Sequence, residues 1–212
     1  MVDVHTPKTP IHSIRGFLIE MVTITVGVLI ALSFEGAREW NHNRSLANEA
    51  RRNIVRELTD NKKAVDHDIE SVPKRREQLD RALQFTDDVL KTGKTAVSKL
   101  ELGFSYGDLS IAGWQTDEHT GALGHMPYDD VQRFASAYVL QNMYQEHERQ
   151  SIADVSTATA AVVAGDPAKA ARADLERFRI TLLTMSADLL IEEQLARQLS
   201  DRYAKVLKEQ VQ

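Results

Sequence analysis

The sequence predicts an all-α fold, in which one N-terminal transmembrane helix continues into a long helix and an extramembrane antiparallel helical bundle follows. Three observations lead to this prediction: one long apolar stretch near the N-terminus, glycine and proline confined to a few points, and apolar residues that recur elsewhere at steps of three and four. Aromatic residues make up only 6% of the 212 residues, which suits aliphatic helices packed on helices. This length allows one domain plus an anchor.

The apolar stretch extends from Phe17 to Phe34. As a helix it would be about 27 Å long, close to the thickness of a bilayer core, which is about 30 Å. A buried core helix would need apolar neighbours, but the next segment is strongly polar. A cleaved signal peptide is the other alternative, because Lys8 and Arg15 precede the stretch, but its apolar run is usually shorter. We therefore predict an uncleaved signal anchor in contact with the lipid bilayer.

The predicted anchor divides the chain into an N-terminal tail (1–13), a transmembrane helix (14–36) and an extramembrane helical bundle (37–212). Positive charge before the span mildly exceeds that after it, which favours a cytoplasmic N-terminus and a bundle outside the cytoplasm. Trp40 follows the span at the position of an interfacial anchor, where tryptophan is enriched.

One face of the predicted span combines an ionisable residue with small and polar residues. Spacing at steps of three and four places the following residues together: Glu20, Thr23, Gly27, Ala31 and Phe34. Gly27 and Ala31 form a small-xxx-small pair that lets another helix approach closely. We expect this membrane association face to bind a second copy or a partner membrane protein. The alternative is that Glu20 only reaches the headgroups and that Gly27 is incidental.

Two stretches resemble a known family. Glu20, the run "GVLIAL" that begins at Gly27, and the pair Trp40–Asn41 resemble an N-terminal segment of uncharacterised bacterial single-span membrane proteins, in which "WNE" follows the span where this chain has "WNH". The stretch "AGWQTDEHTGALGHMPYDDVQRFASAY" resembles a second segment of related proteins. The resemblance implies an anchor in a bacterial inner membrane with a helical periplasmic domain, and it assigns no catalytic residue.

Glycine and proline divide the rest of the chain. Between Gly36 and Gly93 the only such residue is Pro73, which should kink or split one long helix. Its predicted buried stripe is Leu46, Ala50, Ile54, Leu58, Val65, Ile69 and Val72, resumed by Leu79, Leu83, Val89 and Leu90. An irregular segment (93–127) follows, with a short helix around Leu109 to Glu118.

Two further helices are predicted after the irregular segment. The first covers about 128–163 with Val131, Phe134 and Tyr138 buried, and "GDP" at 165–167 provides a stop and a start. The last helix has heptad spacing through Leu175, Phe178, Leu182, Met185, Leu189, Glu192, Ala196, Leu199, Tyr203 and Val206. We expect this seam to pack on the long first helix, although the same residues could pair protomers.

Composition excludes several classes of function. The chain has 26 Lys and Arg against 31 Asp and Glu, which argues against a nucleic-acid partner. The basic run at 74–76 is interpreted as a solvated helix face. The absence of cysteine removes disulfides, thiolate nucleophiles and cysteine metal sites.

Candidate chemistry concentrates in "TDEHTGALGH", which contains Asp117, Glu118, His119 and His125, with Asp129 and Asp130 close behind. The spacing matches no established ligand motif, so a polar helix end is preferred over a metal site, and no cofactor is expected. Trp114 is interpreted as a packing anchor rather than a ligand platform. "HERQ" at 147–150 is interpreted as a solvated face, and no nucleophile elbow or P-loop is present.

Three functions remain open at this point. The first is a membrane-anchored helical scaffold or accessory subunit that self-associates or binds a membrane partner, and it involves no enzymatic activity. The second is a subunit of an ion- or proton-conducting assembly that uses Glu20, since ionisable residues inside membranes often mark such paths. The third is an enzyme or ligand sensor built on residues 105–130.

Overall fold

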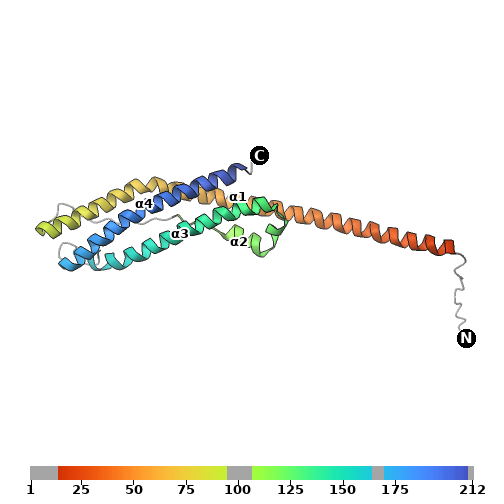
Figure 1. Cartoon of the computed structure of the whole chain (residues 1–212), viewed down its shortest axis with the longest axis horizontal. Coiled ribbons are helices and arrows are strands. Elements are labelled where there is room, and N and C mark those ends of the chain that lie inside the picture. The colour runs from red at the N-terminus through yellow and green to blue at the C-terminus, as the bar shows by residue number, and fades with distance from the viewer. Residues whose placement is uncertain (1–13, 95–106, 164–169, 210–212) are drawn as a thin grey trace, which may run out of the picture.

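The computed structural model describes residues 14–94, 107–163 and 170–209, with side chains described in the second range as far as Ile152. These residues form α-helices and one short 3-10 helix, and no strand occurs among them. The helices are α1 (Ile14–Thr92), α2 (Ala112–His119), the 3-10 helix η1 (Ala122–His125), α3 (Tyr128–Val163) and α4 (Arg172–Glu209) (Figure 1). The predicted all-α class is therefore confirmed.

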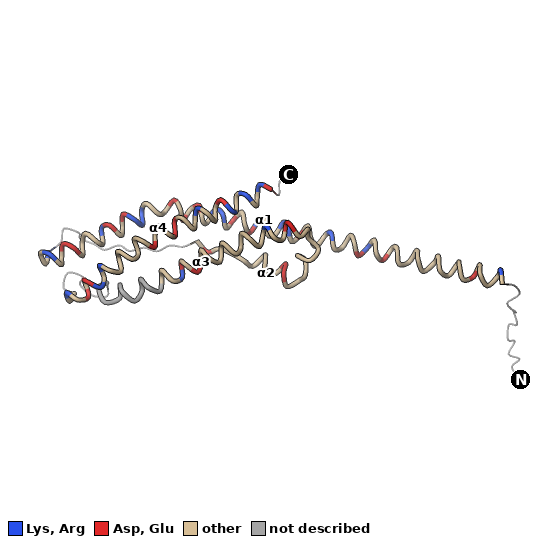
Figure 2. The backbone as a smooth tube through the Cα atoms, viewed as in Figure 1, with Lys and Arg blue, Asp and Glu red and all other residues tan. Residues whose placement is uncertain are grey.

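Helix α1 has two parts with different surroundings. Its N-terminal part projects alone from the bundle, and its second part lies alongside α4 (Figure 1). Within the described residues, one helix is long and apolar enough to cross a membrane, and it is this part of α1, with a mean hydropathy of 2.3 and none of its window buried. Figure 2 shows how sparse charge is there compared with the bundle. The alternative of a buried core helix is wrong, because no other described element covers these residues.

Pro73 does not split α1. The helix is continuous from Ile14 to Thr92, and Pro73 lies in its interior on the exposed side. Proline removes only one backbone donor. Val72 and Leu79 are buried, at 3% and 5% exposure, and pack in the distal core, which α1 forms with α4. The predicted split is therefore wrong, and a kink at Pro73 stays a prediction.

Helix α4 follows its predicted heptad completely. The ten residues of the predicted seam are the ten buried residues of the helix. They pack chiefly on α1, which confirms the expected packing of the last helix on the first. A 3.5-residue apolar repeat keeps one face toward its neighbour over the whole length of a helix, which is why the pattern is so reliable here.

The buried face of α1 is more polar than its predicted stripe. Ala50, Ile54, Leu58, Val65 and Val72 are buried as expected, whereas Leu46 and Ile69 are only partly buried. Among the buried polar residues that were not predicted are Asn61, Asp68 and Arg75. They occupy the same heptad positions as the apolar residues and are seven residues apart.

The core has two parts. The proximal core, nearer the span, joins α1, α3 and α4 and includes the fully buried Ile54, Phe134, Tyr144 and Tyr203. The distal core is formed among described residues by α1 and α4 alone, with members such as Val72, Phe85, Phe178 and Leu189. The ends of α1 and α4 that lie far from the span thus hold each other independently of the described part of α3.

The described part of the irregular segment lies against the proximal core. Helix α2 begins at Ala112, three residues later than predicted, and α3 begins at Tyr128 as expected. Gly121 has φ 76°, a left-handed conformation that suits the turn between α2 and η1. Phe134 and Tyr138 are buried, while Val131 is only partly buried. The predicted stop and start at 165–167 lies outside the described residues.

Candidate functional site

The predicted membrane association face lies on the projecting part of α1. All five of its residues, Glu20, Thr23, Gly27, Ala31 and Phe34, are exposed. The Thr23 hydroxyl donates to the Ile19 carbonyl oxygen at 2.9 Å, which satisfies it within the helix. A Cβ atom added at Gly27 would meet nothing within 4 Å, so the face is open to another helix.

Trp40 lies just beyond the apolar stretch and is 62% exposed. The Arg44 guanidinium lies over its ring, 5.4 Å from the centroid. A cation–π pair of this kind orients an exposed indole. Its position one turn past the span agrees with the depth at which tryptophan meets headgroups.

Polar side chains line the inside of the bundle between α1 and α3. On α1 they are Asn61, Asp68 and Arg75, and on α3 they are Gln141, Tyr144 and Glu148. Each set occupies heptad core positions at steps of three, four or seven, and that spacing is the one sequence signal that could have located them. Of these six residues, Arg75 and Glu148 were assigned to solvated faces from the sequence, and no prediction was made for the others.

The extended segment 107–111 is held in this polar interior through its backbone. Asn61 Nδ2 and Gln141 Nε2 donate to the Ser110 carbonyl oxygen at 2.7 and 3.0 Å, and the Ser110 amide donates to Asn61 Oδ1 at 2.9 Å. The Tyr203 hydroxyl of α4 donates to Gln141 Oε1 at 2.7 Å. Because a buried backbone group without a partner is costly, these side chains make the irregular segment possible.

Glu57 anchors the start of α2. It accepts hydrogen bonds from the Gly113 amide at 2.7 Å, the Trp114 amide at 3.3 Å and the Tyr138 hydroxyl at 2.5 Å. A carboxylate at a helix N-terminus satisfies free amides and interacts favourably with the helix dipole. One α1 side chain thus ties α2 and α3 together.

Trp114 lies on α2 and packs against the proximal core. Its ring centroid is 5.0 Å from that of Tyr138, with a 39° angle between the rings. The tilted arrangement is favourable for two aromatic rings. These are the surroundings of a packing residue, because the Trp114 ring lies against Tyr138, a member of the proximal core.

A buried charged cluster, formed by Asp68 and Arg75 of α1, Glu148 of α3 and Glu192 of α4, lies between the two cores. Arg75 Nη1 donates to Glu192 Oε1 at 2.5 Å, and Arg75 Nη2 donates to the Asp68 carbonyl oxygen at 3.4 Å. Asp68 Oδ2 accepts from the Gly107 amide at 3.0 Å and from the Tyr144 hydroxyl at 3.3 Å. The cluster therefore joins three helices and the extended segment.

The pKa values of two members of the charged cluster are shifted. Burial raises the pKa of the Glu148 carboxyl from its ordinary value of 4.5 to about 7. The Asp68 and Glu192 carboxylates act in the same direction, whereas a hydrogen bond with Tyr144 and the Arg75 guanidinium oppose the rise of this pKa. Burial also raises the pKa of Glu192, against the opposing effect of the Arg75 guanidinium. Desolvation penalises a charged carboxylate, and a neighbouring like charge adds to that penalty.

Two predicted solvated faces are wrong at one residue each. In the basic run 74–76, Arg75 is 8% exposed and paired with Glu192. In "HERQ", Glu148 is 5% exposed. Both side chains point inward because they sit at heptad core positions, where the helix period overrides the polarity of the residue.

The acidic and histidine-rich stretch 117–130 does not converge on one point. Asp117 is buried on α2, and burial raises its pKa, with the Glu49 and Glu57 carboxylates adding to the effect. Asp130 instead forms ion pairs with Arg51 and Arg133. His119 and His125 are exposed. Within the described ranges, no three His, Asp or Glu side chains are arranged to hold a metal ion.

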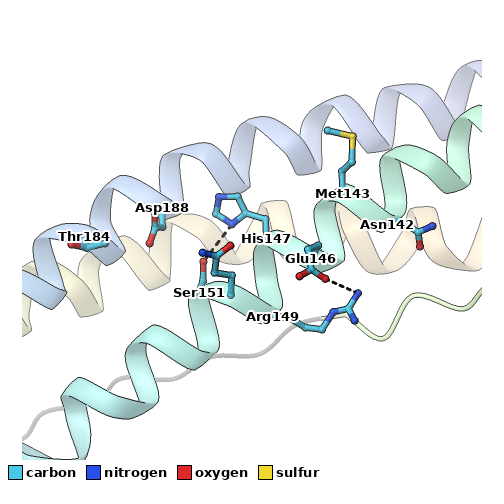
Figure 3. A pocket seen from close by; sticks show the side chains of 9 residues that line it. Asn142, Met143, Glu146, His147, Arg149, Ser151, Thr184 and Asp188 are labelled. Atoms are coloured by element: carbon cyan, nitrogen blue, oxygen red, sulfur yellow. Dashed lines mark hydrogen bonds and ion pairs between the residues drawn. The ribbon is translucent and has the colours of Figure 1, made fainter.

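An open groove of about 740 Å³ lies between α3 and α4 (Figure 3). Its lining is mixed in polarity and includes Met143, Glu146, His147, Ser151, Thr184 and Asp188. The Ser151 hydroxyl lies 3.3 Å from His147 Nδ1, one helical turn away.

Comparison with known proteins gives no match. No protein-family model, no curated protein and no solved structure matches the chain.

Proposed function

We propose that this protein is a membrane-anchored helical scaffold or accessory subunit that self-associates or binds a membrane partner through the face of its span. The observation that carries the proposal is that the two parts of α1 have different surroundings. One continuous helix has an apolar part that contacts no other described element and a second part that forms the spine of the bundle. Such a helix links whatever binds the span rigidly to the bundle.

The exposed face of the span supports association in lipid. The hydrophobic effect does not drive helices together inside a membrane. Helices therefore associate there through close packing of small residues and through polar groups. Gly27 and Ala31 allow close approach, and Glu20 lies on the same face. A carboxylate in the apolar layer costs a few kcal/mol unless it meets a partner or reaches the interface.

The location follows from charge and from the family resemblance. In this proposal the span lies in a bacterial inner membrane, the N-terminus is cytoplasmic and the bundle is periplasmic. The quoted "GVLIAL" and Trp40–Asn41 segment and the charge bias around the span support it. The lack of any nucleophile elbow or P-loop in the sequence leaves no basis for proposing an enzymatic reaction.

Disulfide cross-linking in native membranes tests the association face directly, because the chain has no cysteine of its own. On mild oxidation, an Ala31→Cys variant should form a disulfide efficiently with a second copy. If the span binds a different protein, a thiol-reactive cross-linker should join the Ala31→Cys variant to that partner helix. Leu29→Cys is the matched control, since it lies about 200° around the helix from Ala31. Equal cross-linking of the two variants, or none in either, would contradict the proposed face.

A further inference from the structure

The inward face of α3 changes character along the helix. Its first half buries Phe134, Ala137 and Tyr138, which belong to the proximal core. From Gln141 onward every buried residue of the described part is polar or carries a hydroxyl: Gln141, Tyr144, Glu148 and Ser151. Apart from Tyr144, which belongs to the proximal core, the later part of α3 therefore docks through polar contacts, whereas α1 and α4 hold each other through the distal core.

Glu148 occupies an unusual place in this polar face. It is 5% exposed, and its Oε1 atom has no hydrogen-bond partner among the described residues. The charged and titratable groups that face it are Asp68 and Arg75 from α1, Glu192 from α4, and Tyr144 and His147 from α3. Three carboxylates thus share the surroundings of one guanidinium, and that guanidinium is bonded to Glu192.

This geometry favours a proton on Glu148. A neutral carboxyl can donate a hydrogen bond and adds no charge to the two neighbouring carboxylates, while an ionised one is both desolvated and repelled. The raised pKa of Glu148, about 7, follows from the same burial and repulsion. The open groove between α3 and α4 is lined by His147 and Arg149, the chain neighbours of Glu148.

We propose that Glu148 is a proton-binding site that controls how tightly the later part of α3 docks on α1 and α4. With the proton bound, the polar face of α3 stays against the bundle. Loss of the proton places a third negative charge in the charged cluster, which loosens α3 from Gln141 onward and widens the groove. The inference concerns the bundle alone and does not depend on what the span binds.

The direction of the pH effect follows from linkage. The folded-state pKa of Glu148 lies above its unfolded value of 4.5. The favourable contribution of its proton is therefore fully present below about pH 4.5 and is lost as the pH rises through about 7. The bundle should be less tightly docked in mildly alkaline than in mildly acidic solution.

Thiol labelling of the whole protein in detergent tests the loosening. In a Ser151→Cys variant the buried thiol should react slowly at about pH 6 and roughly tenfold faster at about pH 8, relative to Gln150→Cys at the same pH. Gln150 is the exposed neighbour of Ser151. The ratio of the two labelling rates, Ser151→Cys over Gln150→Cys, therefore corrects for the increase in rate that comes from ionisation of the thiol itself. Adding Glu148→Gln should keep the ratio low throughout, whereas Glu146→Gln, an exposed position on α3, should leave the rise intact.

A ratio that rises equally with and without Glu148→Gln would overturn the proposal. Thermal melting provides a second measurement that does not depend on the introduced thiols. The Glu148→Gln variant should melt about 5 °C above the wild type at about pH 8, and the difference should shrink below about pH 6. A difference that is constant over this range would also overturn it.

Discussion

At the scale of single residues, Gly107 makes the closest approach to its neighbours among the described glycines, where it passes α1. A Cβ atom at this position would lie 3.0 Å from Ala64 Cβ and 3.1 Å from Asp68 Oδ2. Its amide also donates to Asp68, so the backbone cannot move away without breaking that bond. The close approach and the buried acid are therefore parts of one contact.

The Gly107→Ala substitution should lower the free energy of unfolding by about 1–3 kcal/mol, because overpacking forces backbone and neighbours apart. Gly124→Ala is the matched control, since its added Cβ would meet nothing within 4 Å. Urea denaturation followed by circular dichroism measures both. Equal stability of the two variants would show that the 107–111 segment is not held as described.

Residue-scale prediction from sequence was good for apolar side chains and poor for polar ones. Glu192 was placed correctly inside the α4 seam, because nine apolar residues flank it at heptad spacing. Arg75 and Glu148 were placed on the surface, because each sits in a charged run. Their inward orientation depends on partners that lie far away in the sequence, and pattern alone carries no information about those partners.

At the scale of elements, the Arg75–Glu192 ion pair sets how α1 and α4 align. It lies where the proximal and distal cores meet, with the two side chains 9% and 5% exposed. Ion pairs buried to this degree cost desolvation, and a buried polar position can specify the register of paired helices. One turn of registry slip would leave these charges facing apolar residues.

Arg75→Met alone should lower the free energy of unfolding by about 3–5 kcal/mol, because it leaves buried carboxylates uncompensated. Combining it with Glu192→Leu should recover much of that loss. The control is Arg76→Met, which removes an ion pair at the surface between Arg76 Nη2 and Glu193 Oε2, 3.2 Å apart. It should lower the free energy of unfolding by less than about 1 kcal/mol. A double-mutant cycle from chemical denaturation gives the coupling, and additive single effects would refute the expected role.

At the scale of the whole molecule, the bundle stands away from the span. Ala50, the first buried residue of α1, lies sixteen residue steps after Phe34, which correspond to about 24 Å of helix. This stalk is mostly exposed and carries Trp40 near its start. Because the helix is continuous, rotation of the span would turn the bundle with it.

Topology labelling tests the proposed orientation. A Gln150→Cys variant in intact cells should react with a membrane-impermeant maleimide, because Gln150 is exposed on a bundle that we place outside the cytoplasm. Thr6→Cys, in the N-terminal tail, is the matched control and should react only after the membrane is opened. The reverse pattern would place the bundle in the cytoplasm.

Sequence by itself determined the helices, their order, the open apolar part of α1 and the complete buried seam of α4. These features depend on local periodicity and on residues that interrupt it, both of which are present in a single chain. Only the tertiary structure decided that α1 runs unbroken through Pro73, that segment 107–111 is held by α1 and α3, and that Asp68, Arg75, Glu148 and Glu192 meet. The physical reason is that a polar side chain is buried only when distant partners compensate its desolvation, and that compensation exists only once the helices have packed.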